Sequence, residues 1–252
     1  MPQLIITDTP AQLAGEQISS IIQEHIGDVV CLLTGGSVLD IIQHIRPGKK
    51  CFHEDCAGEI CKKSECRTIF MMGDERVSRE SGINNFLQLQ SRYAEHPILQ
   101  HLLPTVPEED ESTKDFALRV ENIFFEKLAS LTNVKIIQVL GVGSDGHTAG
   151  IFPMDKPAFL KIYQDDLTYV PVTLEGLTID SRASFTPHWI LKNVDELIGY
   201  AIGADKQEIL MRLNSEDKKL HERPVELLKL HKRTTLYTDQ DIVPEAESDQ
   251  GI

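Results

Sequence analysis

The sequence predicts an α/β protein built as a three-layer, Rossmann-like domain, in which helices cover both faces of a mostly parallel sheet. Three observations support this fold class. Short apolar runs recur along the chain, and most of them end in glycine before a polar or helical segment. The runs are apolar at consecutive positions, which is typical of parallel strands buried on both faces. Segments with helical periodicity separate the runs.

The first expected elements are a strand and a helix. Residues 3–7 (QLIIT) form the strand. Thr9 and Pro10 are typical of a helix start, and an amphipathic helix follows from Ala11 to His25, with Gly27 expected to end it. The apolar side of this helix carries Leu13, Ile18, Ile21 and Ile22.

Five more apolar runs predict the remaining strands. They are residues 29–34, 67–73, 135–141, 196–203 and 234–237. A helical pattern at residues 38–45 follows the first of these runs across a glycine turn, and a longer helix is expected from Thr113 to Leu131. In sheets of this class ligands bind outside the carboxyl ends of the strands, where the glycines and unusual polar residues of this chain cluster.

The length and composition are those of an ordinary globular protein. With 252 residues, 41% of them apolar, we expect one domain over residues 1–242 and a disordered acidic tail at 243–252. A net charge of -14 argues against a nucleic-acid partner. Because no long apolar run and no signal-peptide pattern occurs, we expect a cytoplasmic protein with no membrane partner. The sequence leaves monomer and dimer open.

Four cysteines repeat at intervals of five residues, which raises the question of a zinc site. They are Cys51, Cys56, Cys61 and Cys66, with His53 nearby. Structural zinc sites usually use chelating pairs two to four residues apart, and five-residue steps on a helix turn each thiol about 140° from the last. We therefore expect reduced thiols and no bound metal.

The turn formed by Gly35, Gly36 and Ser37 lies where a strand meets a helix N-terminus. Small residues let the backbone approach a ligand, and the free amides with the helix dipole favour an anion such as phosphate. A purely structural turn is the alternative, because a Gly-Gly-Ser sequence alone is weakly specific.

Charged residues directly follow the buried run that ends at residue 73. Asp74, Glu75 and Arg76 are expected at the carboxyl edge of the sheet, where unpaired charge is costly. The alternative is an exposed acidic turn in which Arg76 pairs locally. Asn84 and Asn85 either cap the next helix or bind a sugar hydroxyl.

The segment GVGSDGHTAGIFP, residues 141–153, carries the strongest chemical signal. Its glycines, including Gly143, form a loop after a strand and present Asp145 and His147. A carboxylate two residues away can hold the imidazole in one tautomer for acid–base work. The loop lacks the spacing of a dinucleotide fingerprint, so we expect no nicotinamide cofactor, and no other cofactor is indicated.

Five segments occur in a set order along the chain: GGS (35–37), GDER (73–76), GVGSDGHTAGIFP (141–153), SRASFT (181–186) and GADK (203–206). In this order they resemble the 6-phosphogluconolactonase family over nearly the whole chain. The resemblance implies the fold shared with glucosamine-6-phosphate deaminases and ribose-phosphate isomerases. It also implies the substrate, a small phosphorylated sugar lactone: 6-phospho-D-glucono-1,5-lactone, hydrolysed to 6-phospho-D-gluconate in the oxidative pentose phosphate pathway.

The resemblance also assigns residues. His147 matches the histidine proposed as general base, and Arg76 matches an active-site arginine. Arg182 and Lys206 match cations expected around the phosphate. Gly35, Gly36 and Ser37 match the residues whose backbone is expected to bind that phosphate. The chain departs from the family where Val38-Leu39 replaces the usual Thr-Pro, so one hydroxyl directed at the phosphate is expected to be missing.

The mechanism that follows uses one imidazole twice. His147 is expected to take a proton from the water that attacks the lactone carbonyl and to return it to the ring oxygen. Asp145 would orient His147, and Arg76 or loop amides would stabilise the oxyanion. Asp74 and Asn85 are expected to contact sugar hydroxyls.

Two alternatives belong to other functional classes. A glucosamine-6-phosphate deaminase would also use an Asp-Gly-His loop, but its usual sequence after the histidine resembles IAFNEP, whereas this chain has TAGIFP. A non-catalytic sugar-phosphate sensor would need a DNA-binding attachment, and no helix-turn-helix extension is visible.

Overall fold

The computed structural model of the chain describes residues 2–48, 67–174, 176 and 179–242. The four cysteines at positions 51, 56, 61 and 66 and the expected tail at 243–252 lie outside the described residues.

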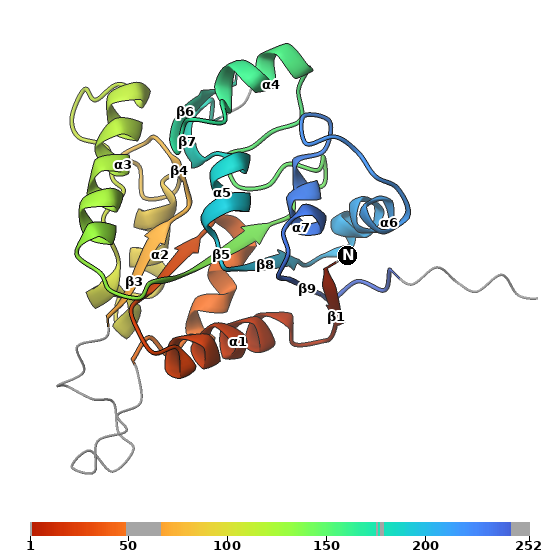
Figure 1. Cartoon of the computed structure of the whole chain (residues 1–252), viewed down its shortest axis with the longest axis horizontal. Coiled ribbons are helices and arrows are strands. Elements are labelled where there is room, and N and C mark those ends of the chain that lie inside the picture. The colour runs from red at the N-terminus through yellow and green to blue at the C-terminus, as the bar shows by residue number, and fades with distance from the viewer. Residues whose placement is uncertain (1, 49–66, 175, 177–178, 243–252) are drawn as a thin grey trace, which may run out of the picture.

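A six-stranded parallel sheet forms the centre of the molecule (Figure 1). Its order is β1-β9-β8-β5-β2-β3, and every neighbouring pair is parallel. The strands are β1 (Gln3–Ile6), β2 (Val29–Leu33), β3 (Thr68–Met72), β5 (Lys135–Gly141), β8 (Glu196–Ala201) and β9 (Thr234–Thr238). Each coincides with a predicted apolar run, so the α/β fold class and the mostly parallel sheet are confirmed.

Helices lie on both faces of the sheet. They are α1 (Pro10–Glu24), η1 (Gly36–His44), α2 (Asn85–Arg92), η3 (Pro97–His101), α3 (Thr113–Ala129), α4 (Lys156–Ile162), α5 (Pro187–Asn193), η4 (Ala204–Lys206), α6 (Gln207–Ser215), η5 (Pro224–Glu226) and α7 (Leu227–Leu230). Helix α1 ends at Glu24, three residues before Gly27, and the segment after the glycine turn is a 3₁₀ helix, η1.

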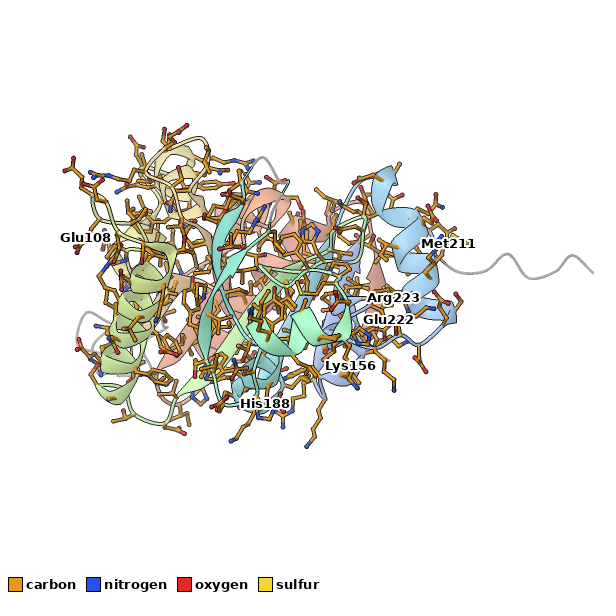
Figure 2. All side chains as sticks on the ribbon, turned by 90° about the horizontal axis from the view of Figure 1, so that it is seen from above. Glu108, Lys156, His188, Met211, Glu222 and Arg223 are labelled. Atoms are coloured by element: carbon orange, nitrogen blue, oxygen red, sulfur yellow. The ribbon has the colours of Figure 1, made fainter. Side chains whose placement is uncertain are left out.

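Strand β2 shows why its residues are apolar at every position. Val29, Cys31 and Leu33 pack into a core shared with α1 and η1. Val30 and Leu32 point to the opposite core, which includes apolar residues of α3, α5, α6 and α7. Since successive side chains of a strand face opposite sides, one core lies on each face of the sheet, between the sheet and the helices that cover it. In the view from above, Glu108 before α3 and Met211 in α6 mark opposite ends of the molecule (Figure 2).

A second, antiparallel sheet was not expected from the sequence. It has the order β4-β7-β6 and consists of β4 (Asp74–Arg76), β7 (Ser181–Phe185) and β6 (Tyr169–Thr173). Strand β4 continues the chain one residue after β3, and the amide of Phe185 donates to the carbonyl of Gly73. Asp74, Glu75 and Arg76, which were predicted at the carboxyl edge of the sheet, therefore lie on a strand, because backbone pairing with β7 extends the chain there.

No helix in the described ranges is both long and apolar enough to cross a membrane.

Candidate active site

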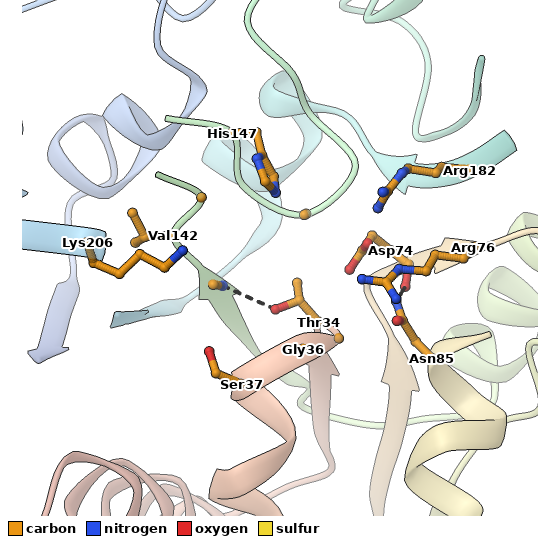
Figure 3. A pocket seen from close by; sticks show the side chains of 14 residues that line it. Thr34, Gly36, Ser37, Asp74, Arg76, Asn85, Val142, His147, Arg182 and Lys206 are labelled. Carbon is orange, nitrogen blue, oxygen red and sulfur yellow. Dashed lines mark hydrogen bonds between the residues drawn. The ribbon is translucent and has the colours of Figure 1, made fainter. Parts of the chain in front are cut away.

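A pocket of about 180 Å³ opens at the carboxyl ends of β2, β3 and β5 (Figure 3). It is smaller than the ~300–1,000 Å³ typical of pockets for drug-sized ligands, and so suits a small molecule. Its lining consists of Thr34, Gly35, Gly36, Ser37, Asp74, Arg76, Asn85, Gly141, Val142, Gly143, His147, Ala149, Arg182 and Lys206. Every residue predicted for the site lines this pocket except Asp145, which contacts His147 instead.

The loop after β5 places His147 in a tight turn. The amide of Gly143 donates to the carbonyl of His147 (2.8 Å), and the amide of Gly146 donates to the carbonyl of Gly143 (2.9 Å). A Cβ atom on Gly143 would lie 2.1 Å from Nδ1 of His147. Glycine at position 143 is therefore required for the imidazole to lie against the backbone.

Asp145 orients the imidazole. Its Oδ1 atom lies 2.5 Å from Nδ1 of His147 and also accepts a hydrogen bond from the backbone amide of His147 at 3.0 Å. The hydrogen bond with His147 lowers the pKa of Asp145 to about 2, although burial acts in the opposite direction. Because the carboxylate engages Nδ1, Nε2 is the ring nitrogen left for chemistry in the pocket, toward which the ring points in Figure 3.

Two arginines enter the pocket from the small sheet. Arg76 on β4 and Arg182 on β7 are direct partners in the antiparallel register, and both side chains point toward the pocket in Figure 3. Burial lowers the pKa of Arg182, and the nearby Asp74 opposes that effect. The Nε atoms of both arginines are buried without a hydrogen-bond partner in the described part of the chain. Like charges opposed across two strands favour an anion between them.

The alternative for Arg76 was local pairing on an exposed turn. Arg76 forms no ion pair with any residue of the described ranges, and its guanidinium donates a 3.5 Å hydrogen bond from Nη1 to the carbonyl of Ile83. Its charge is therefore available to a ligand.

Asp74 and Asn85 present acceptor atoms at the pocket wall. Asp74 is 4% exposed, and burial raises its pKa, while Arg182 and Arg76 pull it down. The Nδ2 atom of Asn85 donates to the carbonyl of Asp74 (3.1 Å). Oδ1 of each residue lacks a hydrogen-bond partner among the described residues. A ligand that brings hydroxyl groups would satisfy both atoms.

The two adjacent asparagines have different roles. Oδ1 of Asn84 accepts the amide of Leu87 at 2.9 Å and so caps α2, whereas Asn85 faces the pocket. Asn85 also packs closely on the glycine turn, because a Cβ atom on Gly35 would lie 2.0 Å from its Oδ1. Asn84 is therefore the helix cap, and Asn85 lies at the pocket wall.

Glu75, for which no separate role was predicted, anchors this wall. It is fully buried and accepts the amides of Arg76 (2.8 Å), Asn85 (2.6 Å) and Phe86 (3.1 Å) and the hydroxyl of Thr105 (2.7 Å). Burial still raises its pKa to about 8, against the effect of these donors. Glu75 ties β4 to the first turn of α2 and so fixes Asn85.

Replacing Glu75 with alanine is expected to lower the free energy of unfolding by roughly 2–6 kcal/mol, because the two buried donors, the amide of Asn85 and the hydroxyl of Thr105, lose their acceptor and buried unsatisfied donors cost about 1–3 kcal/mol each. Chemical denaturation of Glu75→Ala beside Glu80→Ala, a neighbouring exposed carboxylate, measures the difference. Equal stability of the two variants would show that Glu75 does not anchor the wall.

The same group gives a pH dependence of stability. The pKa of Glu75 in the folded protein, about 8, lies above its ordinary value of 4.5, so the folded state binds the proton more tightly. Folding stability contributed by this group therefore falls as the pH rises from about 4.5 to about 8. The unfolding free energy of the wild type, relative to that of Glu75→Gln, should therefore decrease as the pH rises through this window.

The opposite side of the pocket combines a helix N-terminus and a lysine. Gly36 has a φ of 67°, and no side chain caps the first turn of η1. Lys206 lies across the pocket, with Nζ 2.7 Å from Oδ2 of Asp205. Free amides, the hydroxyl of Ser37 and an ammonium group are together suited to an anion.

Val38, which stands where the family usually has threonine, is not among the described residues that line the pocket. Val38 is fully buried in the core and packs on Gly141, whereas hydroxyls line the pocket at Ser37 and Thr34. The lining residues that sequence reasoning did not single out are Thr34, Gly141, Val142 and Ala149. Each is adjacent to or within a motif that was identified, which is the signal that could have found them.

Comparison with known proteins shows the family to which the chain belongs. The model of the family described as glucosamine-6-phosphate isomerases/6-phosphogluconolactonase matches residues 6–237. The chain belongs to this family. No match to an individually curated protein sequence reaches significance.

Solved structures of this family and its relatives share the fold. A 6-phosphogluconolactonase from Trypanosoma brucei has 22% identity and a TM-score of 0.69, covering 96% of this chain and 97% of its own. One from Shewanella baltica has 18% identity and a TM-score of 0.69, covering 94% and 97%. A monomeric glucosamine-6-phosphate deaminase has 18% identity and a TM-score of 0.67, covering 95% and 98%. Because these values are close, the fold alone does not separate lactonase from deaminase.

Proposed function

We propose that this protein hydrolyses 6-phospho-D-glucono-1,5-lactone to 6-phospho-D-gluconate. The observation that carries the proposal is that one small pocket holds a carboxylate-oriented imidazole, His147, together with three cationic side chains. The imidazole supplies proton transfer at neutral pH, and the cations supply recognition of a phosphate.

The cations also explain how a protein with a large negative net charge could bind an anionic ligand. A net charge of -14 repels a phosphorylated ligand at long range. Arg76, Arg182 and Lys206 all line the pocket, and so reverse the sign of the field locally. Arg182 and Lys206, with the amides after Gly35, form the proposed phosphate site.

The chemistry is an acyl transfer to water. Nε2 of His147 takes a proton from a water molecule while the water oxygen bonds to the lactone carbonyl carbon. The carbonyl oxygen thereby becomes an oxyanion. Arg76 stabilises that oxyanion. The bond from the carbonyl carbon to the ring oxygen then breaks, and His147 returns the proton to the ring oxygen, giving a carboxylic acid that ionises and a free hydroxyl. Asp74 and Asn85 accept hydrogen bonds from the sugar hydroxyls.

The deciding experiment uses freshly generated 6-phosphogluconolactone. The rate of acid release with the protein should exceed the spontaneous rate in proportion to protein concentration, and EDTA should leave it unchanged. A rate equal to the spontaneous one refutes the lactonase proposal, and loss of the rate in EDTA refutes its metal-free form.

The same preparation tests the rival activity, which the similar TM-score of the deaminase structure keeps in view. Ammonia release from glucosamine 6-phosphate should be absent, because the sequence TAGIFP after His147 lacks the acidic residue of the usual deaminase segment. Binding of 6-phosphogluconate without turnover of either substrate would instead indicate a sensor.

A further inference from the structure

Phe152 lies between two functional groups of the pocket. Its ring stacks on the imidazole of His147, with ring centroids 4.8 Å apart and an angle of 19° between the planes. The guanidinium carbon of Arg182 lies 5.1 Å from the centroid of the same ring. Phe152 is 8% exposed and does not line the pocket. One buried ring therefore contacts both the proposed base and a proposed phosphate ligand.

The backbone on both sides of Phe152 is held by hydrogen bonds. The hydroxyl of Tyr163 donates to the carbonyl of Gly150 (2.7 Å), and the amide of Gly150 donates to Oγ of Ser184 on β7 (3.2 Å). On the other side, the amide of Met154 donates to the carbonyl of His221 (2.8 Å). The ring is thus fixed relative to β7, the strand that carries Arg182.

Asp145 alone does not define the plane of the imidazole. The imidazole turns about two side-chain torsions, Cα–Cβ and Cβ–Cγ, and a single hydrogen bond at Nδ1 leaves one combined rotation of the ring free. A stacked aromatic face removes this rotation and directs Nε2. A guanidinium over the same ring is likewise held by the negative charge of its face.

We propose that Phe152 is a positioning residue that orients His147 and Arg182 at the same time. The proposal rests on the lactonase function proposed above. It differs from a packing role because an apolar side chain of similar size would fill the space without orienting either group.

The test compares three variants. Phe152→Leu removes the aromatic ring and should lower kcat about 10-fold or more, because a misaligned imidazole loses part of the rate that acid–base catalysis contributes. It should also weaken the binding of 6-phosphogluconate measured by calorimetry. Phe152→Tyr keeps the ring and should restore most of both losses. Phe159→Leu is the matched control, since Phe159 is similarly buried (6% exposed) but its ring contacts Tyr163 and His221; it should change neither quantity.

A spectroscopic readout is independent of turnover. The ring current of Phe152 should displace the NMR signals of the imidazole protons of His147 upfield, with the signal assigned by its absence in His147→Asn. Phe152→Leu should move these signals downfield, while Phe159→Leu should not. In the His147→Asn background, Phe152→Leu should lower kcat no further but should still weaken 6-phosphogluconate binding.

The outcomes separate the two proposals. A folded wild type without lactone turnover refutes the proposed function. An active wild type whose Phe152→Leu variant keeps its kcat, its product affinity and its imidazole signals refutes the positioning role. Failure of Phe152→Tyr to recover what Phe152→Leu loses would also refute it, because the ring would then not be the property that matters.

Discussion

Replacement of His147 by asparagine is expected to lower kcat for 6-phosphogluconolactone about 10²- to 10⁴-fold, which is the usual contribution of general acid–base catalysis. Asparagine keeps a polar side chain of similar size but cannot take up and return a proton. The measurement is the initial rate on fresh lactone, corrected for spontaneous hydrolysis. KM should change little, because the anion contacts remain.

A second histidine provides a matched control. His188 on α5 also lies near a carboxylate, with Nδ1 3.8 Å from Oδ1 of Asp165. It is exposed at the surface (Figure 2) and does not line the pocket. His188→Asn should retain the full rate. If a folded His147→Asn protein turned over lactone as fast as His188→Asn, the imidazole would not be the base.

The pH profile of the wild type separates His147 from its partner. Because the pKa of Asp145 is lowered to about 2 from an ordinary value of 3.8, this carboxylate stays ionised above about pH 4 and loses its charge only as the pH falls through 2. A decline of kcat/KM that begins above pH 4 therefore reports another group. Asp145→Asn should lower kcat/KM throughout the range above pH 4, since the imidazole of His147 loses the carboxylate that orients it.

The double substitution Arg182→Ala with Lys206→Ala is expected to lower kcat/KM for the phosphorylated lactone about 10²- to 10⁴-fold, because each charged hydrogen bond contributes roughly 1.5–3 kcal/mol and each 1.4 kcal/mol is tenfold. The unphosphorylated glucono-1,5-lactone should lose much less, since it lacks the group that these cations bind. The ratio of the two values of kcat/KM is the quantity to measure.

A control must reproduce the change in net charge. Arg212→Ala with Lys218→Ala removes two exposed cations that pair with Glu208 and Glu216 outside the pocket. This protein should keep the wild-type preference for the phosphorylated lactone. Equal losses in the two double variants would mean that long-range charge, and not contact with phosphate, sets the affinity.

The main sheet could be predicted from the sequence because strands buried on both faces are apolar at consecutive positions. Strands β4 and β7 lack this pattern: Asp74–Arg76 is short and charged, and Ser181–Phe185 begins with polar residues. They form because their backbones pair with each other and with Gly73. Pairing between segments more than 100 residues apart is a tertiary property that local pattern does not encode.

The same division applies to the site. The motif around His147 could be found because glycines, a carboxylate and a histidine are adjacent in sequence. The position of Arg182 came only from family resemblance, since nothing local indicates that it faces Arg76. The contacts of Glu75 and Phe152 depend on α2 and β7, so their roles became visible only in three dimensions.

The cross-strand pair of Arg76 and Arg182 has a consequence for the evolution of this protein. Two like charges in register repel each other, although the nearby Asp74 offsets part of that repulsion, so we expect the proposed site to trade stability for activity. Selection for heat resistance alone should replace one of these arginines and yield a more robust, inactive protein. A phosphorylated ligand should act in the other direction, as a stabiliser that raises the melting temperature of the wild type more than that of such a variant.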